Sequence, residues 1–243
     1  SLGRIASLEP FLGTAVLGAR AVVRHGTAAQ QRALFPRLAG GALRVAWVCD
    51  GDDPGEDAAR LAIRAGRVDG GFVLDGQQRC VFDGAGADCL LVAARIEGAP
   101  DDAIGWFLVD AARPGVEARH FARLDGGLAS HFRFVGVEVA AAERLGAPGE
   151  GAAVWADLRR LGMAAACAQA VGAMQALHDR TLEYLKTRQQ FGRPIGQFQV
   201  LQHRQVDMLI ALEQARSIVT VAAMALAEDH PDAGRLLSMA RIT

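Results

Sequence analysis

One short stretch of the chain combines residue types that could bind a nucleotide. RQQFGRPIGQFQVLQ, residues 188–202, separates two long apolar patterns of helical period with a turn that contains Gly192, Pro194 and Gly196. Pro194 cannot continue a helix because it lacks an amide hydrogen, and the two glycines permit a tight reversal. A plain connection between two helices explains this break. It does not explain why a cation, amides and aromatic rings gather around it.

Those side chains suit a dinucleotide. A guanidinium group offers a planar set of donors to phosphate oxygens, and an aromatic ring beside it can cover a flat heterocycle. The side chains in question belong to Arg188, Gln190, Phe191, Phe198, Gln199 and Gln202. Two interpretations therefore stay open, a plain helical hairpin and a hairpin whose turn binds a dinucleotide, and periodicity alone does not single out FAD.

The overall composition is typical of a folded, weakly charged protein. With 51% hydrophobic residues and a mean hydropathy of +0.16 over 243 residues, the chain can bury a large core. Its 26 basic and 27 acidic residues give a formal net charge of −1 without long runs of either sign, which argues against a nucleic-acid partner. An uninterrupted apolar run of about 18 residues is missing, and the start SLGRIASLEP does not read as a signal peptide, so we expect no membrane span.

The cysteines, histidines and acidic residues show no metal-ligand spacing. The cysteines stand far apart in apolar surroundings, which predicts reduced thiols packed as small apolar groups and a cytoplasmic location. They are Cys49, Cys80, Cys89 and Cys167. The acidic run DGDDPGED, residues 50–57, lacks the alternating ligands and final glutamate of a calcium loop. We therefore predict no metal site.

The hydrophobic period changes along the chain. Residues 10–38 carry two short runs of helical spacing, with Thr27 as a plausible N-cap and Gly26 and Gly40 as stops. Residues 44–139 hold about seven short β-type segments punctuated by Gly and Asp. Because most of them have no helical pattern between them, they predict a small antiparallel sandwich or barrel.

Two long helical patterns follow, from about residue 152 to 186 and from about residue 197 to 228. Each is apolar over more than one face, so we expect further helices or another subunit to cover them. The first residue is not Met and the last letters, RLLSMARIT, read as the middle of a helix, so we also expect a chain incomplete at both ends. The expected domains are the end of an N-terminal helical domain (1–43), a central β domain (44–145) and a truncated helical bundle (146–243).

Several of these segments resemble one known family. YLKTRQQFGRPIGQFQVLQHRQVDM resembles the helix-turn-helix signature of the acyl-CoA dehydrogenase family. VLDGQQRCVFDGAGADCLLVAAR resembles its β strands, and ERLGAPGEGAAVWADLRRLGMAAACAQAVGAM resembles the entry into its C-terminal bundle. The resemblance implies an α+β multidomain fold with a helical N-terminal part, a central antiparallel β domain and a C-terminal bundle of long helices.

The resemblance also implies a cofactor and a substrate. FAD would lie between the β domain and the bundle at a subunit interface, and an acyl-CoA would lose its α-proton to a glutamate as its β-hydride passes to the flavin. Asp157 and Arg160 would lie near the CoA moiety. The residues implied to meet the diphosphate and adenosine of an FAD bound mainly to a neighbouring subunit are Arg188, Gln190, Phe191, Phe198 and Gln199.

The catalytic residue is unknown. In most members of the family the glutamate lies beyond the position of Thr243, and in a minority it lies in the first bundle helix, where this chain has Arg159. A guanidinium group stays protonated and cannot act as a base.

Two positions implied to contact the flavin are also altered. Cys49 and Asp50 stand where the family usually has Thr and Glu, and Cys80, Val81 and Phe82 replace a Trp-Ile-Thr or Trp-Ile-Ser triplet. A thiol at Cys49 and a phenyl ring at Phe82 thus replace hydroxyl groups beside the flavin ring, although backbone N–H groups could still serve as donors.

SLEPFLGTAVLGARAVVRHGT, FDGAGAD and RLDGGLASHFRF resemble segments of a divergent branch of small subunits that pair with a homologous acyl-CoA dehydrogenase subunit. The complexes of that branch act on bulky or dicarboxylic acyl-CoAs, including steroid side chains. The resemblance thus implies an FAD-dependent subunit of a homo- or hetero-tetramer, with an electron-transfer flavoprotein or similar acceptor. A flavin-less regulatory subunit is a second interpretation. A flavin monooxygenase or oxidase on the same fold, acting on a substrate without CoA, is a third.

Overall fold

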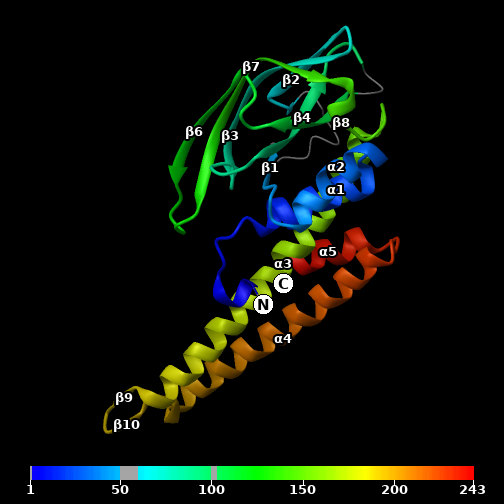
Figure 1. The fold of residues 1–243 in the computed structure, drawn as a ribbon. Helices are drawn as coiled ribbons and strands as arrows, with labels where there is room; N and C mark the ends of the chain where they lie inside the picture. Colours follow the sequence, from blue (N-terminus) through cyan, green and yellow to red (C-terminus); the bar gives the residue numbers. More distant parts are fainter. Residues whose placement is uncertain (1, 50–59, 100–102) are drawn as a thin grey trace. The chain divides into compact units, whose positions relative to one another are not determined.

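The computed structural model describes residues 2–49, 60–99 and 103–243, and its contacts group into two compact units. The larger unit is Leu8–Arg159, and the smaller combines Ser1–Ser7 with Arg160–Thr243. Figure 1 draws the elements of both. The three domains expected from the sequence, with boundaries at residues 43 and 145, stay a prediction.

Helices open the larger unit as expected. A π-helical segment, Phe11–Gly18, leads into α1 (Ala19–His25), and α2 (Ala28–Ala39) follows. Thr27 caps α2, because its hydroxyl accepts a hydrogen bond from the Gln30 amide while the Gln30 side chain accepts one from the Thr27 amide. This capping box stabilises the helix by about 1 kcal/mol.

The π-helical segment was not predicted. The Thr14 hydroxyl donates to the carbonyl of Val45 and accepts from its amide, so the segment is bonded to the start of the first strand. A Cβ on Gly13 would lie 2.8 Å from the Val45 carbonyl oxygen, and one on Gly18 would lie 2.9 Å from Val45 Cβ. These two glycines therefore permit the close approach.

A single eight-stranded sheet fills most of the larger unit (Figure 1). The strand order is β6-β7-β3-β2-β4-β5-β8, with β1 pairing off this path with β4. The strands are β1 (Val45–Val48), β2 (Ile63–Val68), β3 (Gly71–Phe82), β4 (Cys89–Ile96), β5 (Ile104–Asp110), β6 (Val116–Ala122), β7 (Leu128–Ala140) and β8 (Arg144–Leu145). The expectation of a purely antiparallel domain is corrected at β4, which pairs in parallel with both β1 and β2.

Two apolar clusters lie on the two faces of this sheet. In β4, Leu90, Val92 and Ala94 join one cluster while Leu91 and Ala93 join the other, as the twofold period of a strand requires. Strands buried on both faces read as continuous apolar runs, and that is why CLLVAARI shows no polar alternation.

Three tryptophans join the sheet to the start of the first long helix, α3 (Gly151–Thr187). Trp106 lies 4.7 Å from Trp47 and 6.2 Å from Trp155 between ring centroids, and its indole N–H donates to the Gly151 carbonyl over 3.0 Å. A Cβ on Gly151 would come within 2.0 Å of the Ile104 carbonyl oxygen. Glycine is therefore required where the helix begins against β5.

Long helices make the smaller unit, as predicted. It holds the greater part of α3 together with α4 (Gln199–Ala227) and α5 (Ala233–Ile242). A short 3₁₀ turn, Leu2–Ile5, also belongs to it, and a Cβ on Gly3 would lie 2.1 Å from the Gln169 carbonyl oxygen. Arg4 pairs with Asp179 across 2.7 Å.

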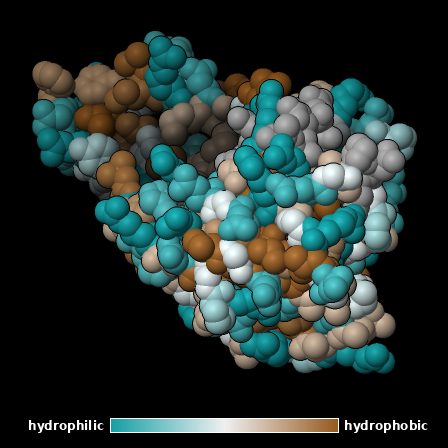
Figure 2. Space-filling model, turned by 90° about the horizontal axis from the view of Figure 1, so that it is seen from above, coloured by the Kyte–Doolittle hydropathy of each residue, from teal (hydrophilic) through white to brown (hydrophobic). Residues whose placement is uncertain are grey.

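The helices of this unit leave apolar side chains exposed. Those on α4 are Val200, Val206, Met208, Leu209, Ile210, Val221 and Met224. By length and composition alone α4 is the one helix among the described residues that could cross a membrane, which is weak evidence because core helices of soluble proteins meet the same test. Figure 2 shows brown, hydrophobic patches among teal ones on the face of the molecule that is seen from above. The expectation that these helix faces need a cover agrees with this exposure.

Candidate functional site

The turn between α3 and α4 is a two-residue hairpin of unusual composition. β9 (Gln189–Gln190) pairs antiparallel with β10 (Arg193–Pro194), and the two residues between them, Phe191 and Gly192, have φ of +52° and +77°. Positive φ at both central residues defines a type I′ turn, which favours Asn-Gly and strains a bulky residue such as Phe. The strained Phe191 side chain is 91% exposed.

Rings and guanidinium groups gather at this turn. The ring of Phe198 lies edge-on to that of Phe191 at 6.1 Å, and the Arg193 guanidinium lies over the Phe198 ring at 4.4 Å. Arg188 is exposed, and its guanidinium makes no ion pair with any described residue. Two cations and two rings on one turn fit the phosphates and flat rings of a dinucleotide.

The amides predicted for this site differ in their availability. The Gln190 side chain donates to the carbonyl of Gln189, and Gln199 is exposed in the first turn of α4. The Gln202 side chain donates to the Gly196 carbonyl over 2.9 Å and so holds the turn itself. The structure thus places the predicted set on one short segment, while their contacts with a cofactor stay a prediction.

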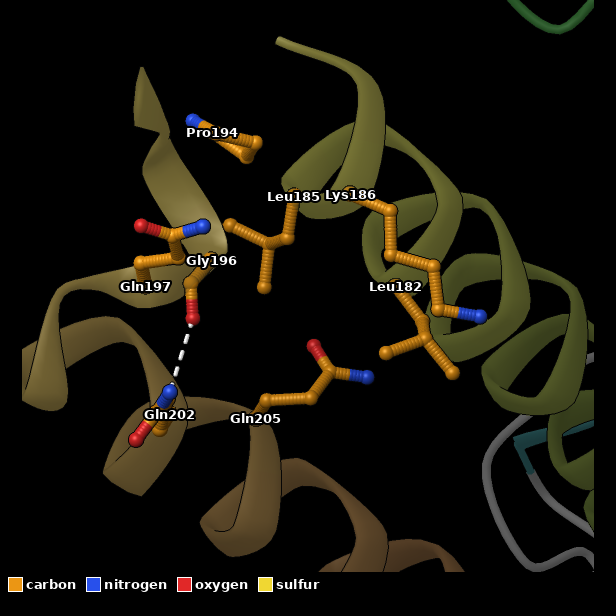
Figure 3. Close-up of a pocket in the computed structure, with 8 residues that line it drawn as sticks. All are labelled: Leu182, Leu185, Lys186, Pro194, Gly196, Gln197, Gln202 and Gln205. Atoms are coloured by element: carbon orange, nitrogen blue, oxygen red, sulfur yellow. Dashed lines mark hydrogen bonds between the residues drawn. The ribbon is translucent and has the colours of Figure 1, made fainter. Parts of the chain in front are cut away.

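A pocket of about 420 Å³ opens beside the turn within the smaller unit (Figure 3). Its lining comes from Leu182, Leu185, Lys186, Pro194, Gly196, Gln197, Gln202 and Gln205. In Figure 3 the Gln205 amide lies between the two leucines, and its Oε1 is buried without a hydrogen bond from any described residue. The pocket thus joins an apolar wall to an acceptor that lacks a donor.

Asp157 is engaged within the larger unit. Arg20 donates two hydrogen bonds to its carboxylate, over 3.0 and 2.7 Å, and His25 Nε2 lies 2.9 Å from Oδ2. Burial raises the pKa of Asp157, but the hydrogen bonds from Arg20 and His25 outweigh burial and hold the pKa below its ordinary value. The carboxylate therefore ties α1 to the start of α3.

The predicted CoA contacts thus differ in kind. Both carboxylate oxygens of Asp157 are already bonded to protein groups, whereas Arg160 is exposed and makes no ion pair with any described residue. Arg159 is also exposed on α3, at the position where the resemblance would place a base. For Asp157 and Arg160, contact with CoA stays a prediction.

The end of β3 carries the predicted flavin-ring residues. The β3–β7 register shifts between Gln78 and Val81, a β-bulge that leaves Cys80 with φ of +56°. Cys80 is exposed and not packed as expected, whereas Cys89 is buried and its pKa is raised to about 12, first of all by burial. Phe82 is 56% exposed and carries the Arg123 guanidinium over its ring at 4.0 Å.

Other predicted residues fall elsewhere. Cys49 is half-buried and packs against the core cluster that also contains Trp106 and Trp155. Asp50 and the rest of DGDDPGED lie outside the described residues. Among the described residues no group of three or more His, Cys, Asp or Glu is arranged to hold a metal ion.

Comparisons with known proteins agree with this architecture. Residues 150–243 match the model of the acyl-CoA dehydrogenase C-terminal domain. The chain is also 35% identical over 211 residues to 2-methylacyl-CoA dehydrogenase of Solanum tuberosum, covering 83% of this chain and 50% of that protein. The chain belongs to the acyl-CoA dehydrogenase family. It spans about half the length of the curated relatives it matches.

Solved structures support the same assignment. A chain of the ChsE4–ChsE5 complex from Mycobacterium tuberculosis is 30% identical, with a TM-score of 0.86 over 98% of this chain and 62% of that one. The FAD complex of PigA is 26% identical, with a TM-score of 0.87 over 95% of this chain and 61% of that one. The acyl-CoA dehydrogenase fold expected from the sequence, with its helices and C-terminal helical part, is confirmed.

Sequence reasoning missed two residues of this acyl-CoA dehydrogenase-family chain that lie beside Phe82 or Cys80. Arg123 covers the Phe82 ring, and His131 accepts a hydrogen bond from the Cys80 amide over 3.0 Å. His131 lies on β7, which pairs with β3, and Arg123 lies just after β6, 41 positions from Phe82, so no local pattern predicts either contact. Without these contacts, an arginine and a histidine are ordinary surface residues.

Proposed function

We propose that this chain is an FAD-dependent subunit that oxidises an acyl-CoA thioester to the 2,3-enoyl-CoA together with a homologous subunit. Membership of the acyl-CoA dehydrogenase family and the likeness to the FAD complex of PigA support the cofactor. The observation that carries the proposal is the strained, exposed Phe191 in a turn that also presents Arg188, Arg193 and Phe198.

Each group of this turn has a role in holding a dinucleotide. Arg188 and Arg193 supply charge-assisted hydrogen bonds to diphosphate oxygens, which are about twice as strong as neutral ones. Phe191 and Phe198 offer ring faces and edges to a flat heterocycle. Because the turn is exposed, a second protein surface must close the site, and a neighbouring subunit is the surface that we propose.

The chemistry divides between the cofactor and the protein. When bound, FAD supplies the acceptor for the hydride equivalent. Arg160 supplies a cation for an oxygen of CoA, and its exposed position on α3 leaves it available for this contact. Arg159 cannot accept the α-proton, so the base is contributed by a residue outside the set assigned in this chain or by the partner subunit.

The likeness to a chain of the ChsE4–ChsE5 complex motivates the partner, because that structure is a complex. We propose a hetero-oligomer of homologous subunits, with an electron-transfer flavoprotein or a similar protein as acceptor. A cytoplasmic location is proposed from the four free cysteines.

The test is an absorption spectrum of the full-length protein, purified alone and after co-expression with the homologous subunit encoded beside it. We expect flavin bands in the co-expressed complex and their bleaching when an acyl-CoA is added without oxygen. A colourless complex that does not oxidise any acyl-CoA contradicts the proposal.

A flavin-less regulatory subunit is the second candidate. Cys49, Phe82 and Arg159 favour it, because none of the three supplies the hydroxyl group or the carboxylate that the resemblance assigns to its position. This candidate predicts that the complex contains one FAD for each partner chain and none for this chain. One FAD per chain of both kinds rules it out.

A further inference from the structure

The end of β3 is strained on both sides of Phe82. Cys80 and Asp83 are two of the five described non-glycine residues with positive φ, at +56° and +59°. Cys80 lies in the β-bulge of the β3–β7 pair. Bulges re-aim side chains, and strained residues concentrate where a ligand is held. The backbone thus points to the segment around Phe82 as part of a site.

The strand register places further side chains on the same face as Phe82. Phe82 pairs with Ala129 of β7, and Ala129 pairs with Phe121 of β6. His131 lies two residues from Ala129 and therefore on the same face, opposite to that of Phe132, which belongs to the core. β3, β7 and β6 lie side by side in Figure 1.

Two contacts orient the imidazole ring of His131. The Cys80 amide donates to Nδ1 over 3.0 Å, and the Phe121 ring packs against the imidazole with 4.7 Å between centroids. Because Nδ1 is the acceptor, the neutral ring carries its hydrogen on Nε2. Nε2 makes no hydrogen bond with a described residue, so the bulge presents a donor in a fixed orientation.

The phenyl ring of Phe82 is covered on one side by a cation. The Arg123 guanidinium covers Phe82 at 4.0 Å and is itself held by an ion pair with Asp125. Since Phe82 stays 56% exposed, part of the ring remains open for stacking. A flat, acceptor-rich heterocycle suits an open ring beside an imidazole N–H.

We propose that the Nε2–H of His131 is a hydrogen-bond donor to the isoalloxazine ring of FAD, and that Phe82, backed by Arg123, is the surface on which this ring lies. The inference rests on the proposed function. It supplies a donor where Cys49 and Phe82 carry no hydroxyl group. His131 is thus a positioning residue of the flavin and takes no part in proton transfer.

Two substitutions of His131 separate the roles of its nitrogens. His131→Asn keeps an acceptor near the Nδ1 position for the Cys80 amide and removes the outer donor. His131→Gln places an amide N–H near the Nε2 position. His120→Asn is the matched control, because His120 bonds Ser130 over 2.8 Å on the opposite face.

The measurements are FAD affinity, the visible spectrum and the midpoint potential of the bound flavin in the full-length complex. For His131→Asn we expect about fivefold to tenfold weaker FAD binding, the loss of about one hydrogen bond, together with a shifted spectrum and potential. His131→Gln is expected to restore most of the affinity, and His120→Asn to match the wild type.

The possible results are distinct. If wild-type complex binds FAD and His131→Asn leaves affinity, spectrum and potential unchanged, the inference is wrong and the proposed function stands. A loss in both Asn variants also overturns the inference, since the effect is then a general one on β6 and β7. If FAD is held only by the partner chain, the proposed function fails, and the inference fails with it.

Discussion

At the scale of single residues, Asp157 shows how partners far along the chain decide the role of a side chain. The resemblance of ADLRR implied a CoA contact for Asp157, and this contact stays a prediction. In the structure Arg20 and His25, more than 130 positions earlier, are bonded to the Asp157 carboxylate. The helical period of the sequence does not predict these two partners, because the pairing depends on how α1 packs against α3.

Asp157→Asn is expected to destabilise the larger unit by about 1–3 kcal/mol, because it removes charge-assisted hydrogen bonds to Arg20 and His25. The pKa of Asp157 is lowered in the folded state, so its stabilising effect is present above the unfolded value and is lost as pH falls through the folded one. The difference in unfolding free energy between the two proteins should therefore be constant at neutral pH and narrow below about pH 4.

Urea unfolding across pH measures this difference. Asp179→Asn is the matched control, because the Asp179–Arg4 pair is 38% and 56% exposed and should contribute little. An equal loss of stability in both variants contradicts the role assigned to Asp157.

Arg188→Lys is expected to weaken FAD binding about fivefold to tenfold, because lysine keeps the charge but loses the planar fork that bonds two phosphate oxygens. Flavin fluorescence titration of the full-length complex measures the affinity. Arg204→Lys, which alters an exposed cation on α4 paired with Asp207 at 3.6 Å, serves as the control and should bind FAD normally.

At the scale of elements, the hairpin turn was predictable and the sheet was not. Pro194, Gly192 and Gly196 act on their own segment, and Thr27 caps the helix that follows it through Gln30, three residues away, so local rules find both features. The parallel pairing of β1 with β4 joins Val45 to Cys89, and the pairing of β3 with β7 brings His131 to Cys80. Such contacts depend on strand order, which period and turn signals do not specify.

Phe191→Gly is expected to stabilise the turn by about 0.5–1 kcal/mol while weakening FAD binding. Glycine adopts the φ of +52° without strain, and the 91% exposed ring gives up little packing when it is removed. Gly192→Ala is expected to destabilise the turn, because alanine is strained at the φ of +77° that Gly192 adopts.

Thermal unfolding and FAD titration of both variants measure the two effects. If Phe191→Gly unfolds at a lower temperature than wild type, Phe191 packs against a surface and the strain argument is wrong.

At the scale of the whole molecule, the exposed apolar side chains of α4 require a cover. Val206, Ile210 and Val221 are each about half exposed. Exposed apolar surface of this extent is typical of protein interfaces.

Val206→Lys combined with Val221→Lys is therefore expected to shift the full-length protein towards smaller assemblies, because each buried ammonium group costs several kcal/mol at an apolar interface. Gln214→Lys, at an exposed polar position of the same helix, is the control. Sedimentation velocity with and without the homologous subunit gives the sizes. Unchanged assemblies in the double variant contradict an interface on α4.

The two-sided burial of β4 bears on how the chain reaches its fold. In a strand with one polar face, a shift of one residue in the pairing register puts polar groups in the core and is therefore strongly unfavourable. In β4 such a slip merely exchanges Leu90, Val92 and Ala94 for Leu91 and Ala93, so misaligned pairing stays apolar on both sides. β4 also pairs with strands from both directions along the chain, β1 before it and β5 after it. We therefore expect intermediates with misaligned strands and slow refolding.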